Sequence, residues 1–343
     1  DDYSIRVSTD GAHFFGLPGE QKFSIAERKA QAWNQEVFGS DREHAVGNDP
    51  LSIGTHWEQN LNYGNVYTVA PNAFSSDYAD LEKSAKALSN TIGAKMNEMT
   101  KDGGVIYFPE GRYYLTGLQV PDNVLLVGAG EDKTTICRVA SKNGGSFINS
   151  YRYANIDGQS VTLSASNIGI AKLTITESEL SGGYPDYYVN FPEGSKTVRD
   201  EYGVLRSPSQ NKFLVNVKVD GYKNKATVES GARARVSVNV YKNCVLRNLD
   251  VDGGTCVSAE SYSYITLENV KFKGNYKNCD TPALQSKYAF IENCRFDLNY
   301  SAHGPSVRSD CYIAHTLTEH TGDRERPTND GEALLVEMPG GYI

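Results

Sequence analysis

One phrase returns four times in the second half of the chain, and it constrains the fold more than any other feature. It consists of alternating apolar residues around an asparagine, as in ITLENVKFKG, and the four asparagines are Asn216, Asn248, Asn269 and Asn293. They are 32, 21 and 24 residues apart. Periods in the low twenties with alternating apolar positions are typical of strands stacked as a solenoid. The sequence therefore predicts that each repeat is one coil of a parallel β-helix.

The asparagine is predicted to mark a corner of each coil. Ile265 and Leu267 lie on one side of a short strand before Asn269, and the apolar alternation resumes after it. Asn tolerates the left-handed backbone conformation, and Asn side chains stacked about 4.8 Å apart can pair their amides. We therefore expect the four asparagines at equivalent corners. The residues expected to begin the next strands are Val217, Leu249, Val270 and Cys294.

The period extends towards the N-terminus. Leu173 and Ile175 align with Val217 and Val219 at an offset of 44 residues, which is two coils, although the corner asparagine is absent there. Residues 103–130 form apolar and aromatic runs between Gly and Pro turns. Asp77 is a predicted N-cap for the helical stripe of Leu81, Ala85, Leu88, Ile92, Met96 and Met99. This helix is expected to cap the open end of the solenoid, because exposed strand edges favour aggregation.

The order of this helix, GGVIYFPEGRYYL, VLLVGAG and the asparagine-containing coils resembles the pectate-lyase-like superfamily. The resemblance covers about residues 75–337 and implies an all-β fold, a right-handed parallel β-helix with an N-terminal capping α-helix. That superfamily includes polysaccharide lyases, glycoside hydrolases and phage tailspikes, so the fold alone does not select a reaction. Residues 1–74 lack the period and are expected to form an irregular segment packed on a solenoid of residues 75–343. NDGEALLVEMPGGYI reads as another coil, so we expect the solenoid to be truncated at its C-terminal end.

Composition limits the classes of partner. The 42 acidic and 34 basic residues give a net charge of −8, which disfavours a nucleic-acid partner. No run approaches the roughly 18 apolar residues of a membrane span. Cys294 occupies an apolar coil position, where a thiol is expected to pack in the core. Because polysaccharide-acting β-helices generally meet their polymers outside the cell, we expect a secreted or cell-surface protein whose leader has been removed.

A tyrosine-rich stretch interrupts the coils. Residues 182–203 lack the period, and long insertions between coils usually project from one side and build the wall of a binding groove. Tyr184, Tyr187 and Tyr188 are therefore candidates for stacking on sugar rings. The alternative is that these aromatic residues pack the loop onto the solenoid.

The strands that follow the long turns supply candidate catalytic residues. TCVSAES, PALQSK and PSVRSD can be aligned so that Val257, Leu284 and Val307 point inward. The predicted outward columns are then Ser258, Gln285 and Arg308, and Glu260, Lys287 and Asp310. Equivalent positions on neighbouring coils are about 4.8 Å apart, so the backbones of Glu260 and Asp310 would be about 9.6 Å apart.

These columns permit two chemistries. Glu260 and Asp310 could approach the roughly 6.5–9.5 Å separation of an acid and a base that flank a glycosidic bond, with Lys287 separating their pKa values. Alternatively, Lys287 and Arg308 could neutralise a uronate carboxylate during elimination, with His303 as a proton-transfer group. A third possibility is a solvated ladder of opposite charges that only stabilises the surface.

No cofactor is expected from the motifs. Asp250 and Asp252 in NLDVDG could contribute to a calcium site, but two alternating carboxylates need further oxygen ligands. We expect an extracellular enzyme that cleaves a polysaccharide. A glycoside hydrolase is favoured over a lyase acting on a uronic-acid polymer, because of the acidic balance and the pair of predicted carboxylates. The alternative from another class is a non-catalytic carbohydrate-binding or adhesive solenoid, such as a tailspike.

Overall fold

The chain is described by a computed structural model that divides it into two units, Asp1–Ala45 and Val46–Ile343. The described residues are 2–4, 6–7, 15–16, 22–24, 65–156, 159–183, 185–192, 198–199, 205–206, 210–221, 236–238, 242–252, 257–258, 264–273, 282–286, 288–297, 303–307, 311–319 and 335–336. At some positions in these strands, only the backbone is described. In the first unit, β1 (Asp2–Ser4) pairs antiparallel with β4 (Lys22–Ser24), and β2 (Arg6–Val7) pairs antiparallel with β3 (Phe15–Gly16).

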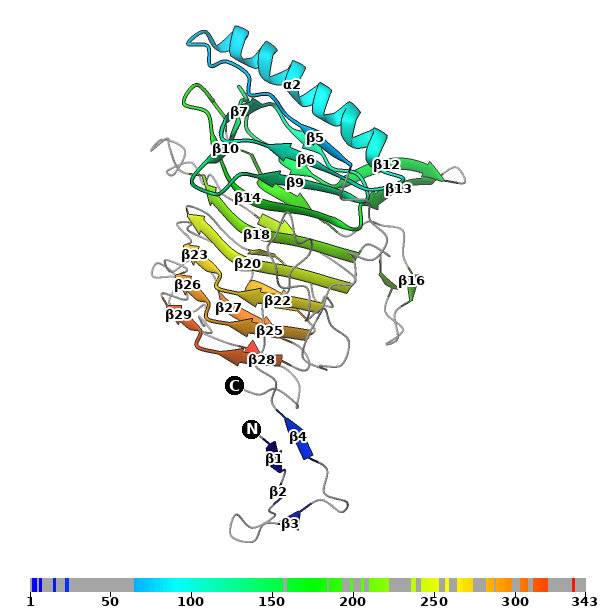
Figure 1. Cartoon of the computed structure of the whole chain (residues 1–343), viewed down its shortest axis with the longest axis vertical. Coiled ribbons are helices and arrows are strands. Elements are labelled where there is room, and N and C mark those ends of the chain that lie inside the picture. Colours follow the sequence, from blue (N-terminus) through cyan, green and yellow to red (C-terminus); the bar gives the residue numbers. More distant parts are fainter. Residues whose placement is uncertain are drawn as a thin grey trace. The chain divides into compact units, whose positions relative to one another are not determined.

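The second unit is a parallel β-helix whose coils contribute to three faces in turn (Figure 1). Face 1 contains β5 (Val66–Thr68), β6 (Gly104–Phe108), β9 (Val124–Gly128), β14 (Ile168–Glu177), β18 (Gln210–Asp220), β20 (Lys242–Asp252), β22 (Tyr264–Glu268), β25 (Tyr288–Glu292) and β28 (Cys311–Ala314). Face 2 contains β7 (Gly111–Leu115), β10 (Thr134–Arg138), the second halves of β14, β18 and β20, then β23 (Lys271–Lys273), β26 (Arg295–Asp297) and β29 (Leu317–Glu319). Face 3 contains two separate sheets. One consists of β8 (Leu118–Gln119), β11 (Ser146–Asn149), β15 (Tyr187–Phe191), β19 (Val236–Val238) and β21 (Val257–Ser258), and the other of β24 (Pro282–Ser286), β27 (His303–Val307) and β30 (Leu335–Val336).

The predicted parallel β-helix is thus confirmed, and its right-handed sense stays a prediction. Strand β5 pairs in parallel with β6, and the predicted division of the chain at residue 75 stays a prediction. Two antiparallel hairpins interrupt the passage from face 3 to face 1. They are β12 (Tyr151–Ile156) with β13 (Gln159–Ser164), and β16 (Val198–Arg199) with β17 (Leu205–Arg206).

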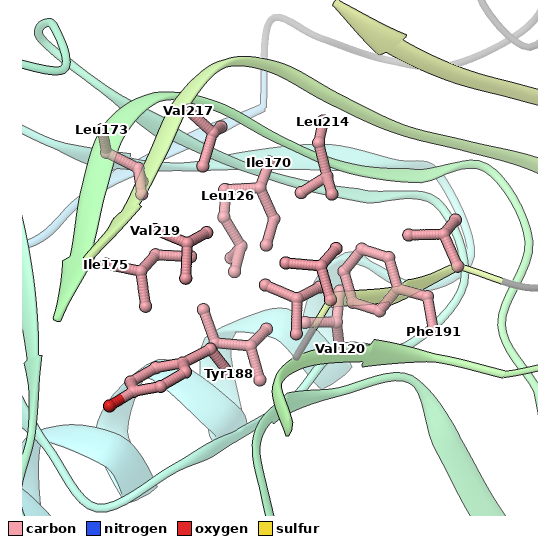
Figure 2. Packing of buried hydrophobic residues seen from close by; sticks show 14 of the residues in the cluster. Val120, Leu126, Ile170, Leu173, Ile175, Tyr188, Phe191, Leu214, Val217 and Val219 are labelled. Carbon is pink, nitrogen blue, oxygen red and sulfur yellow. The ribbon is translucent and has the colours of Figure 1, made fainter. Parts of the chain in front are cut away.

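Apolar side chains stack in columns along the inside of the coils. The middle column of face 1 is buried throughout and consists of Ile106, Leu126, Ile170, Leu214, Leu246, Leu267, Ile291 and Ile313. Figure 2 shows part of this column facing Val120, Tyr188 and Phe191. Cys294 is 3% exposed in the same core, which confirms its predicted packing role. Each coil therefore buries its apolar side chains against those of neighbouring coils and against those of the opposite face.

The corner between face 1 and face 2 has the predicted left-handed conformation. The φ angles of Asn216, Asn269 and Asn293 are 55°, 54° and 52°. The amide of Asn293 donates to Oδ1 of Asn269 at 2.6 Å, as expected for stacked asparagines. Lys172 and His315 occupy the same corner by register, with φ angles of 57° and 50°. The coil that lacks the asparagine therefore still makes the turn.

A second asparagine corner, which the sequence reading missed, lies where face 3 leads into face 1. Asn123 and Asn167 have φ angles of 65° and 57°, and Nδ2 of Asn167 donates to Oδ1 of Asn123 at 2.8 Å. Nδ2 of Asn123 donates to the carbonyl of Thr100, at the end of the helix, at 2.8 Å. Asn123 and Asn167 are 44 residues apart, and Asn211 follows Asn167 after another 44 residues. This repeated interval was the sequence evidence for the corner.

The predicted capping helix is α2 (Tyr78–Met99). Oδ1 of Asp77 accepts from the backbone N–H of Asp80 at 3.0 Å, which confirms Asp77 as the N-cap. The buried residues of the stripe are Leu81, Ala85, Ile92, Met96 and Met99, and Leu88 is partly buried against the core. The helix packs against β6, β7 and β8 and so covers the first coil of the solenoid (Figure 1).

Candidate functional site

Several predicted site residues lie outside the residues that the structure describes. They are Tyr184, Glu260, Lys287, Arg308 and Asp310. Gln285 lies in β24 and His303 in β27, and only the backbone of these two residues is described. Their roles stay predictions.

The pairing of β24 with β27 corrects the alignment that placed these residues in columns. That alignment puts Leu284 level with Val307, whereas the structure pairs Leu284 with Pro305. The alignment was therefore wrong by two residues at this step. Such a slip leaves every side chain on its own face, because side chains alternate with a period of two, so the apolar pattern does not detect it. The observed register therefore does not support the predicted column of Glu260, Lys287 and Asp310.

The tyrosine-rich insertion also differs from the prediction. Tyr188 is 1% exposed and packs in the hydrophobic core (Figure 2). Its ring is not accessible to a sugar, so the stacking prediction is wrong for this residue and the packing alternative holds. Tyr187 is half-buried in β15, opposite Ser146, and its proposed contact with sugar stays a prediction.

Face 2 carries charged residues at two sets of positions that the strand register aligns. In β18 the buried Val217 and Val219 alternate with the partly exposed Lys218 and Asp220. The strand register extends both outward positions along the solenoid. Column A consists of the register positions of Lys218, Asp250, Lys271 and Arg295, and the side chains of all but Asp250 are described. Column B consists of the register positions of Asp220, Asp252, Lys273, Asp297 and Glu319, and Asp220 is the member whose side chain is described. We call the two columns together the charged strip.

The two columns differ in sign. Column A has three cations and one carboxylate, and column B has four carboxylates and one lysine. Neighbouring members of a column are about 4.8 Å apart, and the two columns are about 6.7 Å apart along each strand. The side chains of Lys271 and Arg295 are exposed. By strand register, the charged strip therefore aligns mainly cationic residues beside residues of a type that can accept or release a proton.

A buried ion pair lies at the strand ends next to column B. Arg138 ends β10 and Glu177 ends β14, opposite each other by register. Nη1 of Arg138 is 3.1 Å from Oε1 of Glu177, and the two side chains are 5% and 11% exposed. The hydroxyl of Tyr188 donates to the same Oε1 at 2.8 Å, and the carbonyl oxygen of Gly221 lies 3.4 Å from this hydroxyl. Gly221 directly follows Asp220 of the charged strip.

The electrostatics of this cluster follow from burial. Burial raises the pKa of the Glu177 carboxyl, while the charge of Arg138 opposes the shift. Burial, reinforced by the charge of Glu177, raises the pKa of the Tyr188 hydroxyl well above its ordinary value. Tyr188 thus remains a hydrogen-bond donor. Because Arg138 also donates to the carbonyls of Gly183 at 2.8 Å and Lys142 at 3.3 Å, the cluster joins two loops to the strand ends.

Asp250 and Asp252 are the calcium ligands that the sequence suggests. Within the described part of the chain, no three His, Cys, Asp or Glu side chains are grouped so as to hold a metal ion. Asp250 and Asp252 lie in β20, and their side chains are outside the described residues, so the calcium prediction stays untested. No helix among the described residues is long and apolar enough to cross a membrane.

Sequence reasoning missed the charged strip, although the repeat contained evidence for it. The positions two and four residues after the corner asparagine are charged in all four repeats. These pairs are Lys218 with Asp220, Asp250 with Asp252, Lys271 with Lys273, and Arg295 with Asp297. Comparing the repeats at a fixed offset from the asparagine would have revealed both columns.

Comparisons with known proteins identify the family. Residues 80–305 match the family described as rhamnogalacturonase A/epimerase, pectate lyase-like. The search of curated proteins found no match. Among solved structures, the A-module of the Azotobacter vinelandii mannuronan C-5 epimerase AlgE4 is 14% identical, covers 72% of this chain and 74% of its own, and has a TM-score of 0.32.

Two further structures are similar at the same level. The AlgE6 A-module from the same organism is 14% identical over 76% of each chain, with a TM-score of 0.27. Geobacillus virus E2 ORF18 is 11% identical over 66% of this chain and 50% of its own, with a TM-score of 0.29. The assignment rests on the family match, which covers more than half of the chain. The chain belongs to the rhamnogalacturonase A/epimerase, pectate lyase-like family.

Proposed function

We propose that this protein is an enzyme that modifies a uronic-acid polysaccharide on the charged strip, and that it begins by removing the proton next to the uronate carboxylate. Family membership supports a polysaccharide-acting enzyme. The observation that carries the choice of substrate is the mainly cationic column A beside the mainly acidic column B. A polymer with one carboxylate per sugar matches such a row, because adjacent strands are about 4.8 Å apart, close to the length of one sugar residue.

The cations of column A would bind and neutralise the substrate carboxylate. Removing the proton at C5 of a uronate leaves a carbanion whose charge spreads onto the adjacent carboxylate. A positive group at this carboxylate stabilises the charge as it develops. Lys271 and Arg295 are exposed on adjacent strands, and the guanidinium of Arg295 suits two-pronged binding of a carboxylate.

A carboxylate of column B would accept the C5 proton. Asp220 is partly exposed and lies beside Lys218 of column A in the same strand. Two outcomes can follow proton removal. If the C4–O bond breaks, the electron pair of the carbanion forms a C4–C5 double bond, and the oxygen leaves with the bonding pair and takes up a proton. The chain is then cleaved, as in a lyase. If a proton returns from the opposite face, the configuration at C5 inverts, as in an epimerase.

A glycoside hydrolase is the second candidate. Its earlier support from Glu260 and Asp310 depended on a register that β24 and β27 do not have. Column B instead places Asp252 and Asp297 two strands apart, with backbones separated by about 9.6 Å. This spacing is compatible with the roughly 6.5–9.5 Å between the carboxyls of an inverting hydrolase. For either reaction we propose a secreted or cell-surface enzyme, because such polymers are met outside the cell.

A panel of neutral and uronic polysaccharides tests the proposal. Reducing ends, absorbance of unsaturated products and incorporation of solvent deuterium at C5 are measured together. Reducing ends with unsaturation indicate a lyase, deuterium without cleavage indicates an epimerase, and reducing ends alone indicate a hydrolase. Binding without any of these products supports the non-catalytic solenoid and contradicts the proposal.

Variants connect the reaction to the charged strip. Asp220→Asn should lower turnover at least about tenfold if this carboxylate accepts the proton. Arg295→Gln should raise KM for a uronic polymer and leave the binding of neutral polymers unchanged. Lys95→Gln, which removes a positive charge from the exposed surface of α2, is the matched control. Equal effects of Arg295→Gln and Lys95→Gln would contradict the assignment of substrate binding to column A.

A further inference from the structure

The register positions of column A continue from Lys218 towards the N-terminal end of the solenoid. Lys218 is opposite Thr174, Thr174 is opposite Thr135, and Thr135 is opposite Arg112 in β7. Thr135 and Thr174 are partly exposed, and Oγ1 of Thr174 donates to the carbonyl of Glu131 at 2.6 Å. A single row of outward positions thus runs from Arg112 to Arg295.

Arg112 is part of a cluster that the proposed reaction does not use. Its Nη2 is 3.0 Å from Oε1 of Glu179 and donates to the sulfur of Cys137 at 3.3 Å. The side chains of Arg112 and Glu179 are 44% and 51% exposed. The guanidinium also lies over the ring of Tyr114, with Cζ 5.9 Å from the ring centre.

An exposed aromatic ring completes the cluster. Phe74 is 50% exposed, and its ring centre is 5.6 Å from that of the buried Tyr114. Tyr114 thus supports both the phenyl ring and the guanidinium from below. Exposed aromatic rings beside polar hydrogen-bonding groups suit the apolar face of a sugar, whose hydroxyl groups then reach the polar neighbours.

We propose that Phe74, Arg112 and Glu179 form an accessory binding site for one uronate residue of the polymer. The inference rests on the proposed function, since it extends the same polymer along column A. Arg112 would receive the sugar carboxylate, Phe74 would stack on the ring and Glu179 would accept a hydrogen bond from a sugar hydroxyl. This assignment gives a role to Arg112 and to the exposed ring of Phe74, which lie at the N-terminal end of column A.

The spacing of the strands sets the length of polymer that is needed. Six strand spacings separate Arg112 from Arg295, which is about 29 Å. Three spacings, about 14 Å, separate Lys218 from Arg295. A short oligosaccharide would fill the charged strip without reaching Arg112, whereas a long one would occupy both. The accessory site therefore predicts dependence of affinity on chain length.

The test uses oligogalacturonates and oligomannuronates of two defined lengths. Those of about three sugar residues match the charged strip, and those of about eight are long enough to extend from Arg295 to Arg112. Dissociation constants are measured by titration calorimetry for the wild type, Phe74→Ala and Arg112→Gln. Val66→Ala is the control for Phe74→Ala, because Val66 is also an exposed apolar residue, with an exposed fraction of 48%. Lys95→Gln is the control for Arg112→Gln, because it also removes one positive charge at the N-terminal end of the solenoid. Phe74→Ala and Arg112→Gln should each weaken binding of the long oligosaccharides about fivefold to thirtyfold.

The outcomes separate this inference from the proposed function. The accessory site is supported if Phe74→Ala and Arg112→Gln weaken binding of the long oligosaccharides and leave binding of the short ones unchanged. The two control variants should bind both lengths as the wild type does. Equal weakening at both lengths would overturn it, as would long-chain binding that neither variant changes, while the proposed function stands in both cases. If the wild type binds no uronate of either length, the proposed function fails and the accessory site fails with it. Thermal unfolding of each variant confirms that it is folded.

Discussion

Replacing Arg138 by Met should destabilise the protein strongly. The change keeps a long side chain and removes the charge that accompanies Glu177 in the interior. Nη1 of Arg138 is 3.1 Å from Oε1 and 3.4 Å from Oε2 of Glu177, and 2.8 Å from the carbonyl of Gly183. All these contacts are lost in the variant. Breaking a buried ion pair from one side costs about 3–5 kcal/mol, because the remaining charge is buried without compensation.

A second substitution shows whether the unpaired charge of Glu177 causes the loss of stability in Arg138→Met. Arg138→Met combined with Glu177→Gln should be less destabilised than the sum of the single changes, with a coupling of about 1–3 kcal/mol. Lowering the pH should act similarly. Burial raises the pKa of Glu177 in the folded state, so its contribution to stability is lost as the pH rises through that pKa. The cost of Arg138→Met should therefore shrink as the pH falls and Glu177 becomes protonated.

Urea denaturation followed by far-UV circular dichroism, at several pH values, measures these effects. Lys95→Met is the control, because it breaks an exposed ion pair with Glu98 and should change stability little at any pH. The reasoning is refuted if Arg138→Met unfolds at the same urea concentration as Lys95→Met. It is also refuted if the cost of Arg138→Met grows as the pH falls.

Three further predictions concern the corners, the packing and the alkaline limit. Asn269→Val should be about 1–3 kcal/mol less stable than Asn269→Gly in urea, because φ is 54° at this corner, and equal losses would contradict this. Gly169→Ala should lower the melting temperature at a cost of about 1–3 kcal/mol, since a Cβ there would overlap the ring of Phe213, and an unchanged melting temperature argues against that packing. The raised pKa of Tyr188 means that the unfolded chain releases this proton first as the pH rises through about 10. The wild type should therefore lose stability above that pH more steeply than Tyr188→Phe, and parallel slopes in urea titrations would refute this.

The repeating parts of the fold could be predicted because their causes are local. Apolar alternation determines which side of a strand faces the core, and Asn216, Asn269 and Asn293 take up the left-handed conformation at the predicted corner. The helix follows from its N-cap Asp77 and its apolar stripe. The charged strip was equally predictable, because each corner asparagine sets the register of the charged residues that follow it.

Face 3 could not be predicted in the same way. The segments that precede its strands differ in length, so no common residue sets their register. Leu284 pairs with Pro305, where the pattern suggested Val307. Tyr188 gave a similar ambiguity, since an aromatic residue after a loop can stack on a ligand or enter the core.

The sequence by itself therefore determined the coil, its corners and its capping helix, whose physical causes act within a few residues along the chain. Only the tertiary structure decided which residues meet between coils. A two-residue slip keeps each side chain on its own face, and contacts between distant segments alone distinguish one register from the other.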